Sequence, residues 1–163
     1  MKRKYFIVII FILLISSVFI YGETTIILVR HAEKIRDGSN NPPLAPAGQA
    51  RATELAYILE HVPINAVYST PFRRTKQTVL PVAQKKGLKI RLYDPRENRE
   101  FLKQVLKLHS KGIVLIVGHS NTIPILVNLL EGRERLGILG DKIYDNIFIV
   151  SVFSMGDSKV TRL

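Results

Sequence analysis

The chain has 163 residues, a length that fits one domain, and it carries a net charge of +11. It contains no cysteine, which excludes both a disulfide framework and a lipoprotein anchor. A positive field attracts anions such as phosphorylated molecules or anionic lipid, and plain solubility explains the charge equally well. Nucleic acid is disfavoured as a partner, because the sequence has no basic block with interleaved aromatic residues.

The amino terminus combines a basic start with an uncharged apolar segment. Basic residues at positions 2–4 precede 18 uncharged residues, Tyr5 to Gly22, and this pattern predicts a signal peptide or a membrane anchor over residues 1–22. Either one would place residues 23–163 outside the cytoplasm, because the positive end stays inside. We expect cleavage near Gly22 and an exported, periplasmic domain of charge +8; retention would leave it anchored to the outer face of the cytoplasmic membrane.

The rest of the chain alternates between short apolar segments and longer amphipathic ones. The short segments are rich in β-branched residues and predict strands at 24–29, 66–68, 88–92, 113–117, 143–153 and 159–163. The segments between them predict helices at about 46–60, 71–86, 98–109 and 122–130, with Pro81 bending the second. Strands that alternate with helices indicate an α/β domain, a three-layer α/β/α sandwich with a mostly parallel central sheet.

Basic and imidazole side chains follow three of these strands. Arg30 and His31 come directly after the first strand, and His119 follows the fourth. Arg73 and Arg74 begin the second predicted helix, where the dipole favours an anion and a cation needs a partner. Ligands of open α/β sheets bind at the carboxyl ends of strands. The pattern therefore predicts a phosphate site, because guanidinium groups pair well with phosphate oxygens.

The motifs around these residues resemble the histidine phosphatase superfamily, also called the phosphoglycerate mutase-like family. Arg30-His31-Ala32 resembles its Arg-His-Gly signature, with alanine in place of glycine. Residues 69–78 resemble its Ser-x-Pro-x-x-Arg-Ala-x-Gln-Thr element, and residues 117–120 resemble its Val-Gly-His-Ser element. Residues 44–52 resemble its Leu-Thr-x-x-Gly segment. The resemblance runs in order from Thr24 to about Leu130.

The resemblance implies the fold of that family and the mechanism of a metal-independent, histidine acid-type phosphatase without a cofactor. His31 would attack phosphorus and form a phosphohistidine. Arg30, Arg74 and His119 would bind the equatorial oxygens of the phosphoryl group. The alignment places Arg74, and not Arg73, on the phosphate-binding arginine of the family.

The general acid and the remaining substrate contacts are open at this point. Glu33 lies next to the nucleophile and Asp94 follows the third strand, so both are candidates to protonate the leaving group. An ion pair for Glu33 and a helix cap for Asp94 are the alternative, structural roles. Ser69 and Asn121 are further candidates for binding the substrate.

The sequence thus predicts a phosphatase that acts on a phosphomonoester or a phosphohistidine. Its substrate would be a phosphorylated small molecule, a glycolipid or a phosphoprotein, and only residues 1–22 would contact a membrane. A non-catalytic anion-binding module of the envelope is one alternative. A phosphoglycerate mutase-type phosphotransferase is less favoured, because the Trp-Glu-Gly element of mutases is missing. A serine hydrolase centred on Ser120 is also disfavoured, since Thr122 stands where the nucleophile elbow needs glycine.

Overall fold

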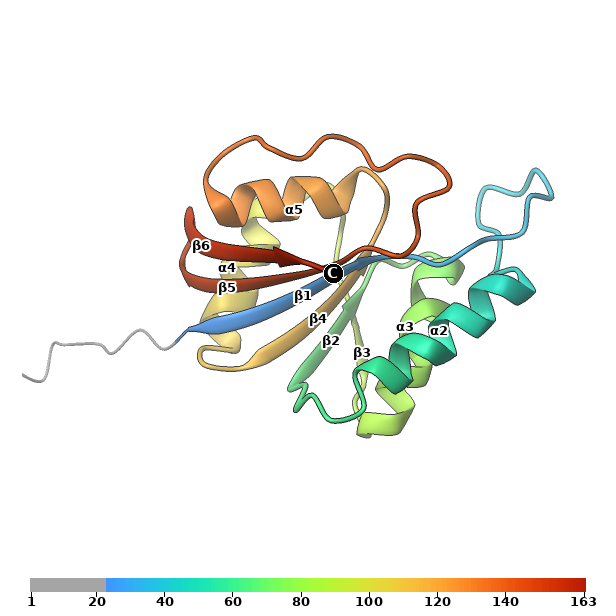
Figure 1. The fold of residues 1–163 in the computed structure, drawn as a ribbon, viewed down its shortest axis with the longest axis horizontal. Coiled ribbons are helices and arrows are strands. Elements are labelled where there is room, and N and C mark those ends of the chain that lie inside the picture. Colours follow the sequence, from blue (N-terminus) through green and yellow to red (C-terminus); the bar gives the residue numbers. More distant parts are fainter. Residues whose placement is uncertain (1–22) are drawn as a thin grey trace, which may run out of the picture.

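A six-stranded sheet with two helices on each face forms the centre of the protein in the computed structural model, which describes residues 23–163 (Figure 1). The signal peptide or anchor predicted for residues 1–22 lies outside the described residues. Within residues 23–163, none of the helices combines the length and the apolar character that crossing a membrane requires.

The strands and helices follow one another in the order that the sequence predicts. The strands are β1 (Thr24–Arg30), β2 (Ala66–Ser69), β3 (Ile90–Leu92), β4 (Ile113–Gly118), β5 (Ile147–Ser154) and β6 (Asp157–Arg162). The helices are α2 (Pro46–Ile58), α3 (Arg73–Lys86), α4 (Asn98–Leu108) and α5 (Thr122–Glu131). The sheet order is β3-β2-β4-β1-β5-β6, in which the first four strands are parallel and β5 and β6 are antiparallel to their neighbours. The predicted fold class is therefore confirmed.

Several element boundaries differ from the prediction, and the starts of α3 and β5 differ most clearly. Helix α3 begins at Arg73, because Phe72 before it has an extended backbone with φ −76° and ψ 148°. Pro81 lies inside α3 without ending it. Strand β5 begins at Ile147 and not at residue 143, because its pairing with β1 begins at Ile147; the Ile143 carbonyl instead accepts a hydrogen bond from the Arg30 side chain.

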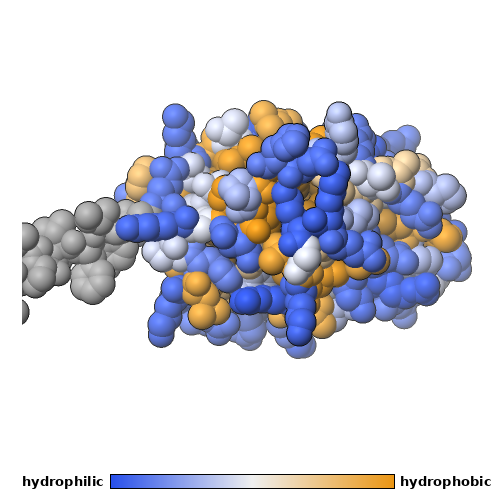
Figure 2. Space-filling model, turned by 90° about the horizontal axis from the view of Figure 1, so that it is seen from below, coloured by the Kyte–Doolittle hydropathy of each residue, from blue (hydrophilic) through white to orange (hydrophobic). Residues whose placement is uncertain are grey.

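Alternate residues of the central strands pack against opposite helical layers. In β1, Ile26 and Leu28 join the core formed with α4 and α5, whereas Ile27 and Val29 join the core formed with α2 and α3. A strand covered on both faces needs apolar residues at every position, which explains the uninterrupted apolar segments in the sequence. On the face shown in Figure 2, hydrophobic residues are visible in the centre between hydrophilic side chains, with smaller hydrophobic patches toward the edges.

The connections of β1 and β4 determine where the site forms. These strands are adjacent and parallel, but the chain leaves β1 for α2 on one face and leaves β4 for α5 on the other. The carboxyl ends of such a strand pair open into a crevice where ligands of α/β proteins bind. Arg30 is in register with Gly118, and the His31 backbone N–H donates to the Gly118 carbonyl at 2.9 Å. The two histidines that follow these strands are therefore brought together.

A close approach at Gly48 fixes α2 against the segment after His31. A side-chain Cβ at this position would collide with the backbone carbonyl of Glu33. The Ala45 N–H also donates to that carbonyl, at 2.9 Å. Glycine is therefore required where the first turn of α2 meets the strand end, and this contact holds the nucleophile segment in place.

Candidate active site

His31 is buried, neutral and held in one tautomer. Its Nδ1 lies 2.8 Å from the carbonyl oxygen of Ala32, and only a protonated nitrogen can donate to that acceptor. Nε2 therefore keeps its lone pair. Burial is the main cause that lowers the pKa of His31 to about 4, and the positive charges of Arg74 and Arg30 lower it further, against the opposing Ala32 hydrogen bond. The ring is thus an unprotonated nucleophile at neutral pH.

Ala32 fits at the position where the family signature has glycine. Its methyl group is completely buried against Leu44 and Ala52. Its backbone N–H donates to the Thr78 hydroxyl at 2.9 Å, and that hydroxyl donates to the Arg74 carbonyl at 2.7 Å. The alanine is therefore accommodated without exposure, and its backbone N–H connects the segment after β1 to α3.

His119 lies beside His31, with ring centroids 5.5 Å apart, and a buried hydroxyl chain fixes its tautomer. Its Nδ1 faces Arg74 Nη2 at 3.4 Å, and a guanidinium can only donate. Neutral His119 therefore carries its proton on Nε2, which lies 3.0 Å from the Thr70 hydroxyl. Thr70 in turn lies 2.9 Å from the Thr75 hydroxyl, which donates to backbone carbonyls. Burial lowers the pKa of His119 to about 3, with Arg74 as the next cause.

Arg74 presents unpaired donors beside His119. Its Nε and Nη1 are buried and have no hydrogen-bond partner among residues 23–163. The guanidinium lies over the Phe72 ring, with its Cζ 4.5 Å from the centroid. Arg74 and His119 line a cavity of about 310 Å³ together with Asn121 and Thr122 at the start of α5. Buried donors without acceptors carry a large free-energy cost, so this arrangement favours an anionic ligand.

Arg30 ties a long loop to the end of β1. Its Nη1 donates to the carbonyls of Gly140 and Ile143, both at 2.8 Å, and its Cζ lies 4.3 Å from the centroid of the Tyr144 ring. The loop between α5 and β5 that carries these residues arches past α5 in Figure 1. Arg30 Nε is buried and has no partner within the described part of the chain. Arg30 is therefore committed in part to structure, while the sequence predicts only a phosphate contact.

The structure argues against both predicted general acids. Glu33 accepts three hydrogen bonds from Arg51 of α2, which lower its pKa. Asp94 pairs with Arg96, and hydrogen bonds from Arg96 lower the pKa of Asp94 to about 2. A carboxylate that is held ionised is an acceptor and has no proton to give at neutral pH.

The two further predicted contacts differ in position. Asn121 is exposed at the start of α5 and lines the same cavity as His119. Ser69 is completely buried, and its hydroxyl donates to the Thr70 carbonyl at 2.8 Å, so it does not face a ligand.

The structure adds residues that the sequence analysis does not single out. Thr70 and Thr75 hold His119, Phe72 lies under Arg74, and Tyr144 covers Arg30 with its ring centroid 6.3 Å from that of His31. Thr70, Phe72 and Thr75 lie inside the motif at residues 69–78, so the motif could have identified them as residues of the site. Tyr144 lies in an irregular loop and carried none.

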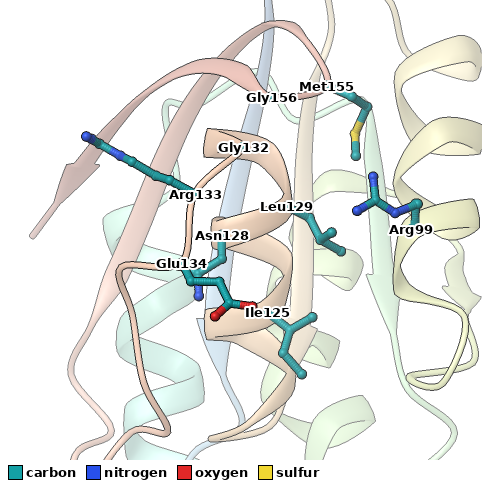
Figure 3. A pocket seen from close by; sticks show the side chains of 9 residues that line it. All are labelled: Arg99, Ile125, Asn128, Leu129, Gly132, Arg133, Glu134, Met155 and Gly156. Carbon is teal, nitrogen blue, oxygen red and sulfur yellow. The ribbon is translucent and has the colours of Figure 1, made fainter.

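A second cavity lies away from the histidines, beside α5. It has a volume of about 450 Å³, and Figure 3 shows Ile125 and Leu129 along α5, with Arg99 and Met155 pointing toward each other. None of the predicted site residues lines it. In the described residues, no group of three or more His, Asp or Glu side chains could hold a metal ion.

The sequence comparison identifies the same family as the motifs. Residues 26–95 match the model of the histidine phosphatase superfamily (branch 1). This region contains His31 and Arg74. A search of curated protein sequences finds no match. The resemblance to the histidine phosphatase superfamily is therefore confirmed.

Solved structures with the same fold carry phosphatase names. A mycobacterial glucosyl-3-phosphoglycerate phosphatase has a TM-score of 0.70 at 13% identity, over 85% of this chain and 97% of its own. The protein histidine phosphatase SixA, complexed with tungstate, has a TM-score of 0.68 at 19% identity, over 85% and 96%. A phosphoserine phosphatase variant from Entamoeba histolytica, complexed with phosphoserine, has a TM-score of 0.66 at 17% identity, over 85% of this chain and 95% of its own. At these identities the likeness establishes the fold alone.

Replacement of Arg74 by alanine should weaken the binding of inorganic phosphate by about 10–100-fold, because a charge-assisted hydrogen bond contributes about 1.5–3 kcal/mol. Arg73→Ala is the matched control, since Arg73 is exposed and its backbone N–H binds Asn41. Isothermal titration of both variants measures the difference. A larger loss for Arg73→Ala would show that the arginines are assigned one residue out of place.

The free energy of unfolding should decrease when the pH falls from 6.5 toward 4. His31 and His119 have folded-state pKa values of about 4 and about 3, below the ordinary 6.5, so the unfolded chain binds protons that the folded chain does not. Their contribution is complete above pH 6.5 and is lost on acidification, by up to about 1.4 kcal/mol per pH unit for each histidine. Urea unfolding at pH 7.5 and 5.0 measures this loss of unfolding free energy. His31→Asn should reduce the acid sensitivity, and an unchanged sensitivity would contradict the assignment.

Proposed function

We propose that this protein, which resembles the histidine phosphatase superfamily in its motifs and its fold, hydrolyses a phosphomonoester or a phosphohistidine through a covalent intermediate on His31. The observation that carries the proposal is the free Nε2 of His31. Its ring is neutral, its Nδ1–H is committed to Ala32, and the unpaired donors of Arg74 lie nearby.

In the first step, Nε2 of His31 attacks phosphorus, and the bond to the leaving group breaks. Charge moves onto the equatorial oxygens and the leaving group in the transition state. Arg74 supplies donors that need no reorganisation, because they are buried and already lack acceptors. Arg30 contributes its charge from the end of β1 while its Nη1 holds the loop.

In the second step, water attacks the phosphohistidine and the electron pair of the P–N bond returns to Nε2. His119 can take up a proton on Nδ1, because Thr70 already accepts the hydrogen bond from its Nε2–H. The resulting imidazolium would donate to a phosphate oxygen. The hydroxyl chain thus allows His119 to be neutral without a ligand and charged with one.

The same donors would serve a non-catalytic anion-binding module, and nothing in the site requires mutase activity. The neutral, oriented His31 favours catalysis, because an anion binder would gain more from a protonated histidine. A phosphorylated small molecule, a glycolipid and a phosphoprotein are all consistent with the cavity. The exported location stays a prediction, since it depends on residues 1–22.

Replacement of His31 by alanine should abolish turnover of an aryl phosphate, because no other group can form the covalent intermediate. Rapid mixing of the wild-type protein with substrate should give a burst of phosphohistidine that His31→Ala lacks. His61→Ala, at an exposed histidine, is the matched control and should retain activity. Near-wild-type turnover by His31→Ala would refute the mechanism, and phosphate binding without any burst would favour the anion-binding module.

Replacement of Thr70 by valine should lower kcat by about 10–100-fold, because it leaves the Nε2–H of His119 buried without an acceptor, at a cost of about 1–3 kcal/mol. Thr70→Ser keeps the hydroxyl and should recover most of the rate. The pH profile of Thr70→Val should also change, since His119 would lose its fixed tautomer. If valine and serine at this position behave alike, Thr70 only fills space.

A further inference from the structure

The cavity of about 310 Å³ that Arg74 and His119 line is called the anion cavity here. An apolar groove continues from it across the start of α3 to the end of β3. It has a volume of about 600 Å³, and Pro71, Phe72, Leu92 and Pro95 form its apolar lining. Phe72, Pro95 and Arg96 line both the groove and the anion cavity. A phosphate held by Arg74 and His119 would therefore have its leaving group next to the groove.

The groove exposes apolar side chains at the end of β3 and the start of α3. Leu92 is 57% exposed on the edge strand β3, and the Phe72 ring is only partly covered. The two charged residues of the groove, Asp94 and Arg96, pair with each other at 2.6 Å. The groove therefore offers contact area to an uncharged, apolar group and no unpaired charge to a polar one.

The chemistry of the site sets a second condition on the leaving group. Glu33 and Asp94 are each paired with an arginine that lowers the pKa of the carboxyl, which disfavours proton donation to a departing alkoxide. A phenolic oxygen, with a pKa near that of tyrosine at about 10, departs without this help far more readily than an aliphatic alkoxide does. An aromatic ring meets this condition and also fills an apolar groove.

We propose that the groove is a leaving-group subsite and that the substrates are phenolic phosphate esters. This inference rests on the proposed function. His31 Nε2 forms a bond to phosphorus as the P–O bond to the ring breaks, and the electron pair leaves on the phenolate, which takes a proton from water. Water then attacks the phosphohistidine, which releases phosphate and restores Nε2. The ring stacks on Phe72 and contacts Leu92.

The test compares substrates of similar leaving-group basicity that differ in ring size. The wild-type kcat/KM should be about tenfold higher for 2-naphthyl phosphate than for phenyl phosphate, because the second ring buries additional apolar area. Leu92→Ser should reduce this ratio to below threefold. Leu80→Ser is the matched control, since Leu80 is 42% exposed on α3 and lines neither cavity, and it should keep the ratio.

The outcomes separate this inference from the proposed function. Acetyl phosphate has a good leaving group and no ring, so its hydrolysis by the wild-type protein reports the proposed function alone. A wild-type ratio near one, or a ratio that Leu92→Ser leaves unchanged, would overturn the subsite. Leu92→Ala provides a second variant if the serine variant unfolds. A phosphotyrosyl peptide, tested beside 2-naphthyl phosphate, shows whether a protein-borne or a free phenolic ester is preferred.

Discussion

The pairing of β1 with β4 is the constraint on which the site depends. Both strands end in a histidine segment, and their register places Arg30 opposite Gly118. Because α2 and α5 leave these strands toward opposite faces, the space beyond the strand ends stays open. The apolar side chains on both faces stabilise this pair, so the same residues that form the core also fix the distance between the two histidines.

Burial then gives these residues their chemistry. In water, a histidine exchanges between protonated and neutral forms near physiological pH. Here His31 and His119 are 4% and 9% exposed and lie beside two arginines, which removes the protonated form at neutral pH. The hydrogen bonds that the rings donate to the Ala32 carbonyl and the Thr70 hydroxyl select one nitrogen of each ring. Burial keeps both rings neutral, and the two acceptors therefore determine which ring nitrogen of each histidine keeps its lone pair.

Much of this arrangement could be predicted from the sequence, and the remainder could not for physical reasons. Strand-end positions such as His31 and His119 follow from the uninterrupted apolar segments before them, which indicate strands buried on both faces. The partners of Glu33 and Asp94 depend on where Arg51 and Arg96 point, and side-chain direction leaves no pattern in a single sequence. The loop residue Tyr144 follows Ile143, whose main-chain carbonyl accepts a hydrogen bond from Arg30, and a main-chain acceptor leaves no pattern in the sequence.

The attachment of the α5–β5 loop to Arg30 has a consequence for how the protein can diversify. The guanidinium donates hydrogen bonds to the main-chain carbonyl groups of Gly140 and Ile143, and the loop side chain it lies against is the ring of Tyr144. Main-chain carbonyls survive nearly every substitution, so the loop can change its side chains while it keeps its anchor. Substitutions in the loop can therefore change the surface beside the cavity while Arg30 still holds the loop at the end of β1. Selection for a different ligand can proceed in this way while the fold is conserved.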